Sequence, residues 1–546
     1  MKKRILCLVL ALVLVVAAFT GCGRKKGADA EVIDVSVSAP NEFPIVEEKI
    51  TLKVFMPKPR NTNDMVDNEF TKWYEEYTNV HIEWIVPTGD AQQAFNNMIA
   101  GGDYPDVIMD MGLSREQVMS LEEQGIVRDI SKYIEKQGVN INKMFEEVPK
   151  AKEYVTFEDK IYGVPSVNNS YNTKVSNAMW VYEPWLKKLN IEAPTTTEEF
   201  YEMLKAFKEQ DPNGNGKADE IPLAARGVSN YSAGIEAYLM SAFIPTEGNV
   251  RWYVENDKVK HVAVQDEYKE GLKYIKKLYD EGLLYEDTFI VDRTQLTAIG
   301  ESDTPILGTS PGSYPGFFCN TSGTTPNYKA YVPILPLEGP KGVRATVPNR
   351  SACSGTSFIV TTSCKYPEVA VKWCDYFYST EGRRKMTSTG LGTFRKAEPG
   401  ELGISGKQAL WTTEPATEEQ IAKYGSGTSN YAWGGSPTGY TSFEESVSIC
   451  NLGASLENSK KLYQIYETYS EFIVDTFKTI TIAPEDADEY ARYQPLTSQI
   501  DSYFAKFITG ELSIEKDWDK YLKELDGLGI NDYVALLQRN YDRENK

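Results

Sequence analysis

Strand-like and helix-like segments alternate over residues 50–109, and this pattern restricts the possible folds of the chain more than any other feature. The strand-like segments, in which apolar residues alternate or run together, are 50–56, 80–86 and 106–109, and the helix-like segments between them are 64–78 and 90–100. Gly101 and Gly102 end the second helix-like segment. Five alternating segments in about 60 residues are typical of a parallel, doubly wound α/β sheet.

The carboxyl ends of these strands are the expected place for a ligand, because open α/β sheets bind ligands beyond that edge. Asp110 follows the third predicted strand directly. We therefore predict that Asp110 is the main polar contact to a bound ligand.

A second α/β unit is predicted to begin near residue 172. A strand at 179–182 leads into a short helix, and Thr196 with Glu199 forms a capping-box pattern before the next helix. A further strand is expected at 358–361, and Pro367 marks the first turn of another helix. The C-terminal third is mostly helix-like, whereas the Gly-, Ser- and Thr-rich stretch 383–450 suggests long loops.

The first 22 residues have the order of a bacterial export signal. Three basic residues precede the apolar run 5–19, which is too short to span a bilayer and is followed by Thr20, Gly21 and Cys22. The end of this run resembles a lipobox, although Phe19 stands where Leu is usual. We predict a signal peptide at 1–21, a lipid-bearing Cys22 that anchors the protein to the outer face of the membrane, and a flexible spacer at 22–47. The alternative is an ordinary secretory peptide with a chance cysteine.

Charge and composition exclude several classes of function. The formal charge of the chain is −20, and removal of Lys2, Lys3 and Arg4 with the signal makes it −23. Such an acidic protein is not expected to bind nucleic acid. Only two histidines occur, so zinc sites built on His and Ser-His-Asp catalysis are nearly excluded. After Cys7 and Cys22 five cysteines remain, at spacings that indicate no disulfide framework, although one or two bridges are possible.

Four segments in order resemble the extracellular solute-binding proteins of carbohydrate ABC importers, family 1. They are GDYPDVIMD (102–110), DKIYGVP (159–165), MWVYEPWLKKLNI followed by PTTTEEF (179–200), and SFIVTTSCKYPEVAVKWCDYFYSTEG (357–382). Within that family the chain is most similar to the long branch of alginate-oligosaccharide-binding proteins.

The resemblance implies a two-lobed periplasmic-binding-protein-like α/β fold (type II) with the ligand between the lobes. By this analogy one lobe takes residues 48–170 and 298–362, and the other takes 171–297 and 363–546. It also implies a monomer that is not an enzyme, an oligosaccharide as ligand and the subunits of an ABC permease as partners.

The segment 211–220, DPNGNGKADE, reproduces the first half of an EF-hand calcium loop. The candidate ligands are oxygen donors at alternating positions and at the end of the segment: Asp211, Asn213, Asn215, the Lys217 carbonyl, Asp219 and Glu220. Pro222 replaces the bidentate Glu that usually stands twelfth, and the resemblance implies that Glu220 takes that role. We predict one structural calcium ion. The alternative is a polar turn after the preceding helix.

Aromatic residues in predicted loops are the candidates for stacking against sugar rings. They are Tyr231, Tyr314, Trp411, Tyr431 and Trp433. Trp433 is the preferred platform, because the glycines after it leave room for close approach of a ligand. Arg350 is a further polar candidate, whereas Trp73, Trp185 and Trp373 fall on apolar helical faces and are assigned to the core.

Other functions fit part of the same sequence. A surface glycoside hydrolase or lyase would also be exported, acidic and rich in aromatic residues, and would need two placed carboxylates. A peptide-binding importer component would share the fold, and a binding protein that docks on a sensor kinase would share the site. No catalytic motif stands out, so we favour a binding protein.

Overall fold

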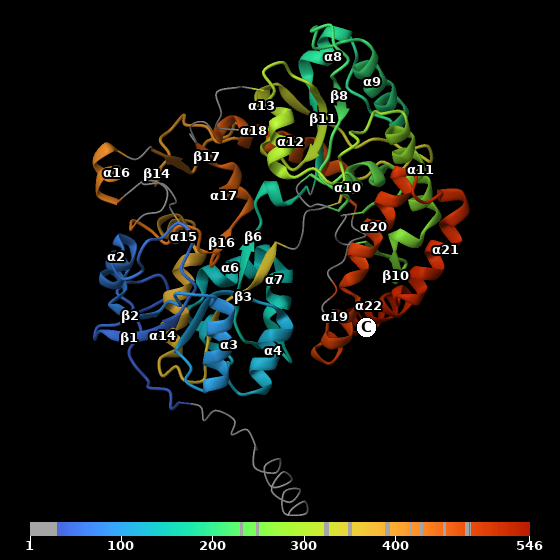
Figure 1. Ribbon diagram of the computed structural model, residues 1–546. Coiled ribbons are helices and arrows are strands. Elements are labelled where there is room, and N and C mark those ends of the chain that lie inside the picture. The colour runs from blue at the N-terminus through green and yellow to red at the C-terminus, as the bar shows by residue number, and fades with distance from the viewer. Residues whose placement is uncertain are drawn as a thin grey trace, which may run out of the picture. The chain divides into compact units, whose positions relative to one another are not determined.

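The computed structural model describes residues 30–545 except 176, 230–232, 247–250, 321–326, 348–351, 388–393, 415–416, 425–429, 451–454, 475–479 and 481. The chain forms two compact units, each assembled from three stretches of sequence (Figure 1). Unit 1 comprises Met1–Ser166, Gly355–Thr389 and Tyr424–Gly439, and unit 2 comprises Val167–Ser354, Gly390–Lys423 and Tyr440–Lys546.

The main sheet of unit 1 is mixed and has the strand order β16-β6-β13-β3-β1-β2. Its strands are β1 (Ile50–Phe55), β2 (Val80–Ile85), β3 (Val107–Leu113), β6 (Val164–Asn168), β13 (Cys353–Val360) and β16 (Tyr440–Thr441), the last of which pairs with the part of β6 that belongs to unit 2. β1 is parallel to β2 and to β3, whereas β13 is antiparallel to β3. The helices α2 (Glu69–Thr78) and α3 (Ala91–Gly101) connect the parallel strands, so the predicted α/β alternation is confirmed.

Local sequence explains these elements. Ile50, Leu52 and Val54 alternate on the buried face of β1. The Asn68 side chain caps α2 by accepting from the backbone N–H groups at 70 and 71. The other elements of unit 1 are α4 (Arg115–Glu123), α5 (Ser131–Gln137), α6 (Val139–Glu147), α7 (Pro149–Val155), β4 (Thr156–Phe157), β5 (Lys160–Ile161), α14 (Pro367–Asp375) and α15 (Thr380–Thr387).

An aromatic cluster fills part of the core of unit 1. Its members are Phe70, Tyr74, Trp84, Trp373, Phe377 and Trp433. The ring centroids of Trp373 and Phe377 lie 4.8 Å apart in an edge-to-face arrangement, which aromatic pairs prefer. The cluster joins α2, α14 and the segment around residue 433, and thus holds all three stretches of unit 1 together.

Residues 30–46 form a strap along unit 1, so the prediction of a flexible spacer over 22–47 is wrong for this part. The backbone N–H groups of Ala30 and Ile33 donate to Thr362 and Lys365 carbonyls, both at 2.9 Å. The ammonium group of the buried Lys372 donates to Ser38 O, Ser38 Oγ and Ala39 O at 2.7 Å each. Residues 22–29 lie outside the described residues.

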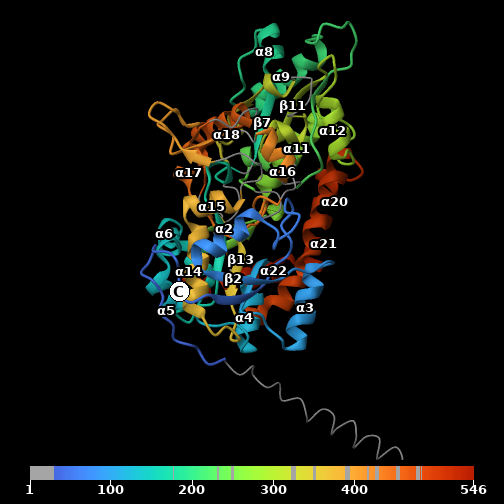
Figure 2. The same cartoon turned by 90° about the vertical axis from the view of Figure 1, so that its left-hand side faces the viewer.

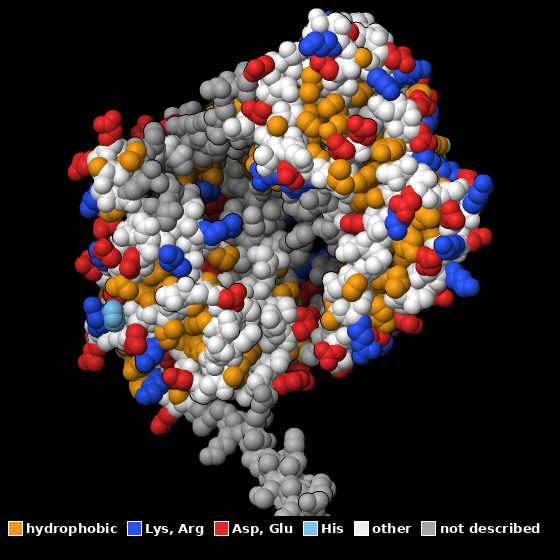
Figure 3. All heavy atoms as spheres, viewed as in Figure 1, with side chains coloured by type: hydrophobic (Ala, Val, Ile, Leu, Met, Phe, Trp, Pro, Cys, Tyr) orange, Lys and Arg blue, Asp and Glu red, His pale blue; other side chains and the backbone are white. Residues whose placement is uncertain are grey.

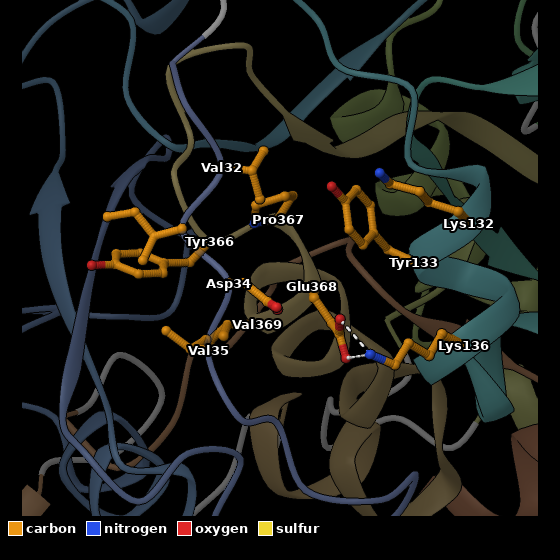
Figure 4. A pocket seen from close by; sticks show the side chains of 11 residues that line it. Val32, Asp34, Val35, Lys132, Tyr133, Lys136, Tyr366, Pro367, Glu368 and Val369 are labelled. Carbon is orange, nitrogen blue, oxygen red and sulfur yellow. Dashed lines mark hydrogen bonds and ion pairs between the residues drawn. The ribbon is translucent and has the colours of Figure 1, made fainter.

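Apolar contacts complete the docking of the strap. Ile45 and Val46 are buried, and the Phe43 ring stacks on Tyr77 with centroids 4.3 Å apart. Next to the strap lies a pocket of about 360 Å³ between its residues 32–35 and the helices α5 and α14. Figure 4 shows this pocket with the Lys136–Glu368 ion pair on its far side from Val32. Docking of this segment could not be predicted, because its few apolar residues follow neither a helical nor a strand period.

Unit 2 is built on a four-stranded sheet of order β12-β7-β11-β8. The strands are β7 (Ala178–Tyr182), β8 (Ile221–Leu223), β11 (Leu307–Gly312) and β12 (Tyr331–Ile334). β11 is parallel to β8 and antiparallel to β7. The smaller sheets are β9 (Trp252–Glu255) with β10 (Lys258–His261), and β14 (Phe394–Lys396) with β15 (Trp411–Thr413) and β17 (Ile449–Cys450).

Helices make up the rest of unit 2, and the C-terminal third is mostly helical as predicted. They are α8 (Glu183–Leu189), α9 (Thr197–Glu209), α10 (Glu236–Leu239), α11 (Asp266–Asp280), α12 (Arg293–Gly300), α13 (Asn327–Ala330), α16 (Glu418–Tyr424, which reaches the unit boundary), α17 (Phe443–Val447), α18 (Ser455–Tyr469), α19 (Ala487–Tyr493), α20 (Pro495–Thr509), α21 (Ile514–Gly527) and α22 (Ile530–Asn545). The capping box predicted at Thr196 and Glu199 is present at the start of α9.

A buried ion network fastens α20 to α10 inside unit 2. Glu236 is fully buried, and its Oε2 lies 2.7 Å from Nη2 of the equally buried Arg251. Arg251 also contacts Asp501 of α20, and the Tyr268 hydroxyl donates to Glu236 Oε1 at 2.8 Å. Both charges therefore have partners, as buried ions require.

The observed units differ from the predicted lobe boundaries. Residues 298–354, which we assigned to the first lobe, belong to unit 2, because β11 and β12 pair with β7 there. The helices α14 and α15, assigned to the second lobe, belong to unit 1. Strand pairing between segments more than a hundred residues apart determines this division, and a local pattern carries no information on it.

The surface of the protein carries charged side chains of both signs (Figure 3). Figure 3 shows acidic and basic side chains interspersed over the visible face, and pairs such as Lys187–Glu183 place opposite charges 2.9 Å apart. Of the helices that the structure describes, none has the length and apolar character to cross a membrane. Cys319, Cys364, Cys374 and Cys450 have free thiols, so in the described part of the chain these four form no disulfide bridge.

Candidate functional site

Asp110 is the fourth of the seven residues of β3, so it lies inside the strand and not directly after it as predicted, and it adopts a left-handed backbone conformation with φ of 60°. Its Oδ1 accepts hydrogen bonds from the backbone N–H and the hydroxyl of Thr438, at 3.1 and 2.6 Å. Its Oδ2 is buried and has no hydrogen-bond partner among the described residues. Burial raises the pKa of Asp110, and the bonds from Thr438 oppose the rise. The carboxylate thus fixes the segment around residue 438, next to the point where the chain passes into unit 2.

Trp433 is a core residue, and the prediction that it is a platform for a ligand is wrong. Its side chain is 1% exposed, and its indole N–H donates to Thr71 Oγ1 at 2.8 Å. The glycines after it make room for the chain itself, because a Cβ on Gly434 would lie 2.9 Å from the Cβ of Asn61.

The other predicted contact residues fall into two groups. Tyr431 belongs to unit 1, where it is half-buried with its ring 5.3 Å from that of Tyr424. Tyr314 and Trp411 belong to unit 2 and are also half-buried. Tyr231 and Arg350 lie outside the described residues. The structure therefore describes Asp110 and Tyr431 in one unit and Tyr314 and Trp411 in the other.

Two arginines join Tyr314 at one edge of the sheet of unit 2. β8 and β11 are parallel, so their carboxyl ends lie at the same edge, where Arg226 and Tyr314 follow them. Arg293, at the start of α12, donates from Nη2 to Gly316 O at 3.0 Å. Its guanidinium lies 5.5 Å from the centre of the Phe317 ring. Burial and the neighbouring Arg293 lower the pKa of Arg226.

This edge combines aromatic faces with guanidinium donors, the two groups that a polyhydroxylated ligand uses. Sequence reasoning missed Arg226 and Arg293, because the strand at 221–223 was not predicted. Had that strand been recognised, the rule that ligands bind beyond strand carboxyl ends would have pointed to Arg226.

The loop 211–220 follows α9 and is closed by its own polar groups. The Asp211 carboxylate accepts from the backbone N–H groups of Gly214, Asn215 and Gly216 at 2.9 to 3.1 Å. The side-chain amides of Asn213 and Asn215 donate to Asp219 at 2.9 to 3.0 Å. The N–H of the exposed Lys217 donates to Asn215 Oδ1 at 2.8 Å. The predicted ligands are thus gathered in one turn.

The donor set of this loop fits a calcium ion. Oε1 of Glu220 is buried and lacks a hydrogen-bond partner among the described residues. Burial raises the pKa of Glu220, and the nearby charges of Asp211 and Asp219 add to the rise. A cation would relieve both the orphaned oxygen and the repulsion between the carboxylates. In the part of the chain that the structure describes, no three His, Cys, Asp or Glu side chains form a metal site by themselves, so amide and backbone oxygens would have to complete the shell.

Comparison with known proteins gives a consistent result. The family model of bacterial extracellular solute-binding proteins matches residues 60–384. The chain is 27% identical over 545 residues to the fructooligosaccharide ABC transporter substrate-binding protein FusA of Streptococcus pneumoniae, with 96% of each sequence covered.

Solved structures extend this similarity. FusA in complex with kestose, and an EF-hand mutant of FusA in complex with fructo-nystose, each match with a TM-score of 0.64 and 25% identity, over 91% of this chain and 99% of theirs. An HMO-binding solute-binding protein from Bifidobacterium longum infantis matches with a TM-score of 0.72 and 25% identity, over 90% and 99%. The alginate-binding protein AlgQ2, solved without calcium ion, has the same fold, with a TM-score of 0.60 and 21% identity over 91% and 99%.

Proposed function

The chain belongs to the bacterial extracellular solute-binding proteins, and on this premise we propose that it captures an oligosaccharide outside the cell and delivers it, chemically unchanged, to the permease of an ABC importer. The observation that carries the proposal is the similarity to FusA over 96% of both sequences. The fold and the polar and aromatic groups at the carboxyl edge of unit 2 support it.

We propose candidate ligand contacts in each of the two units, taken separately. In unit 2 Tyr314 and Trp411 supply aromatic faces, and Arg226 and Arg293 donate to hydroxyl groups. In unit 1 Tyr431 supplies an aromatic ring. Asp110 positions the chain segment after Tyr431 through its hydrogen bonds with Thr438. Tyr231 and Arg350 stay candidates from the sequence.

Calorimetry on the purified protein tests this function. The ligands are kestose, fructo-nystose, other oligosaccharides of neutral and acidic sugars, and a set of peptides. Tyr314→Ala should weaken oligosaccharide binding by about 0.5–1.5 kcal/mol, a two- to tenfold rise in Kd. The matched control is Tyr104→Ala. Tyr104 is also half-buried, but it lies before the amino end of β3 in unit 1, at the opposite end of that strand from the edge where a ligand is expected.

Three outcomes would contradict the proposal. Binding of peptides while every oligosaccharide fails would overturn the class of ligand. Release of shorter sugars during the incubation would show an enzyme. Equal effects of the Tyr314 and Tyr104 substitutions on the Kd for oligosaccharide would contradict the assignment of the ligand to the carboxyl edge of the sheet in unit 2.

We also propose that Cys22 is the mature N-terminus and carries the lipid anchor. Support comes from the basic residues, the apolar run and the small residues before Cys22. Cys22→Ala should move the protein from the membrane fraction to the medium. The control is Cys7→Ala, which changes a cysteine inside the apolar run and should leave the protein anchored.

A structural calcium ion in the loop 211–220 is the third part of the proposal. Asp211, Asn213, Asn215, the Lys217 carbonyl, Asp219 and Glu220 would hold it, as oxygen donors suited to calcium. The orphaned oxygen of Glu220 supports the assignment. The ion would stabilise the fold of the loop and takes no part in contacts with the oligosaccharide.

A further inference from the structure

The stretch of sequence between the proposed lipid anchor and the docked strap is short. Residues 23–29 are the seven residues between Cys22 and Ala30, where the strap begins. Eight steps along a fully extended chain cover at most about 28 Å. Without the strap, the chain from Cys22 to residue 47 would reach about 85 Å.

The strap leaves unit 1 at a defined edge of the sheet. Ala30 binds Thr362, just after β13 ends, and Arg128 Nη2 donates to the same Thr362 carbonyl at 2.8 Å. The neighbouring Thr361 N–H donates to Asp106 O, directly before β3 begins. This edge is therefore the one at which the parallel strands have their amino ends. Figures 1 and 2 show the strap leaving unit 1 at its lower end in both views.

The greatest distance that the chain can span from Cys22 to Ala30 is smaller than the diameter of unit 1. The described part of unit 1 contains about 180 residues, and a compact body of that size is about 40 Å across. A chain of about 28 Å cannot pass around such a body to bring its opposite edge to the membrane. A released strap of about 85 Å could do so.

From these lengths, and resting on the proposed anchor at Cys22, we propose that the docked strap holds unit 1 with the amino ends of its parallel strands facing the lipid bilayer. The carboxyl ends, where ligands of such sheets bind, then face away from the membrane. The partner of this edge is the lipid surface itself.

Lys372 makes the main hydrogen bonds that hold the strap against unit 1. Its ammonium uses all three donors on Ser38 and Ala39, and its side chain is buried in α14. Burial lowers the pKa of Lys372 to about 8. Methionine has a similar length and no donor, so Lys372→Met removes the three bonds and keeps most of the packing.

Energy transfer to the membrane tests the orientation in the full-length lipidated protein. The protein is placed in vesicles of phosphatidylcholine and phosphatidylglycerol that carry an acceptor dye on the headgroups. A donor dye is attached to Lys365→Cys, an exposed position beside the strap, or to Gly89→Cys, which follows the carboxyl end of β2 and has open space around a Cβ. The half-buried Cys353 and Cys450 are first replaced by Ser.

The expected result is transfer about twofold or more stronger from position 365 than from position 89. Insertion of about twenty Gly and Ser residues between Asp29 and Ala30 leaves the strap docked but lengthens the tether, and should abolish the difference. Lys372→Met should reduce the difference in energy transfer between positions 365 and 89. The matched control is Lys143→Met, whose side chain is 68% exposed on α6 and which should keep the full difference.

Two results would overturn the orientation alone: equal or reversed transfer from the two positions with the native tether, or a difference that survives the insertion. Flotation of the vesicles is measured on the same samples. Protein that does not float would overturn the anchor at Cys22 and this orientation together, whereas calorimetry on the released protein would still test oligosaccharide binding. The failures of the separate proposals are therefore distinguishable.

Discussion

Replacement of Trp433 by alanine distinguishes a core residue from a ligand contact. The Trp433 ring is 1% exposed and lies edge-to-face against Phe70 and Trp84, with centroids 4.9 and 5.1 Å away. Its indole N–H donates to Thr71 Oγ1, and the Thr71 hydroxyl itself donates to Met65 O at 2.7 Å. Thr71 therefore keeps a hydrogen bond in the variant, and the loss comes mainly from the cavity.

These contacts determine the expected magnitude. Trp→Ala in a packed core lowers the free energy of unfolding by about 3–5 kcal/mol, through the lost burial and the cavity left behind. Trp433→Phe keeps an aromatic ring and loses the hydrogen bond and some volume, so we expect about 1–2 kcal/mol. The half-buried Trp411, replaced by alanine, should change the free energy of unfolding by at most about 1 kcal/mol.

Urea unfolding followed by circular dichroism measures these differences, and calorimetry with a bound oligosaccharide is run on the same variants. Because the protein has two units, the transition of unit 1 is fitted separately. Under native conditions, folded Trp433→Phe should bind the oligosaccharide as the natural protein does. If Trp433→Ala unfolds at the same urea concentration as the natural protein and fails to bind, the ring faces the ligand and the assignment to the core is refuted.

Three further predictions concern Glu236, the buried His261 of β10 and the loop 211–220, all in unit 2. Glu236→Gln leaves the buried Arg251 without its main counter-charge, so we expect the free energy of unfolding to fall by about 3–5 kcal/mol in urea, and an unchanged midpoint would contradict this. Burial and Arg251 lower the pKa of His261 to about 3, so the unfolded chain alone binds this proton between pH 6.5 and 3. Stability should thus fall by about 1.4 kcal/mol per pH unit below 6.5, and His261→Asn should remove that part of the slope. A calcium chelator should lower the melting temperature of the natural protein, since an ion at a hundred times its Kd stabilises by about 2.7 kcal/mol, but not that of Asp211→Ala, and the exposed Asp303→Ala should keep the sensitivity.

The sequence predicted those parts of the fold that depend on neighbouring residues. The alternation in β1, β2 and β3 and the capping box at Thr196 are local, and all are present in the structure. The division into units depends on β11 pairing with β7, more than a hundred residues away in sequence, so periodicity could not reveal it. The strap escaped prediction because its contacts follow no regular period in the sequence. They are the three bonds from Lys372, the buried Ile45 and Val46, and the Phe43 ring stacked on Tyr77.

The parts of the candidate site that require particular residue types could be predicted from the sequence. The loop 211–220 gathers the predicted oxygen donors, because Asp and Asn at alternating positions favour a tight turn. Flanking glycines suggested an open site around Trp433, but they serve close packing against Asn61. Arg226 and Arg293 come together only through strand order in unit 2, which no local pattern carries.

The aromatic cluster of unit 1 also gives the molecule a built-in optical probe. Trp433 lies 5.1 Å from Trp84 and 6.1 Å from Trp373, measured between ring centroids. Indoles this close exchange excitation energy, and their electronic transitions couple, so the three rings absorb and emit as a group. This group should therefore contribute a near-ultraviolet dichroism signal that reports the packing of unit 1. The other unit holds five tryptophans of its own, among them Trp411. The difference between the natural protein and Trp433→Phe therefore identifies the part of the signal that belongs to the packing of unit 1.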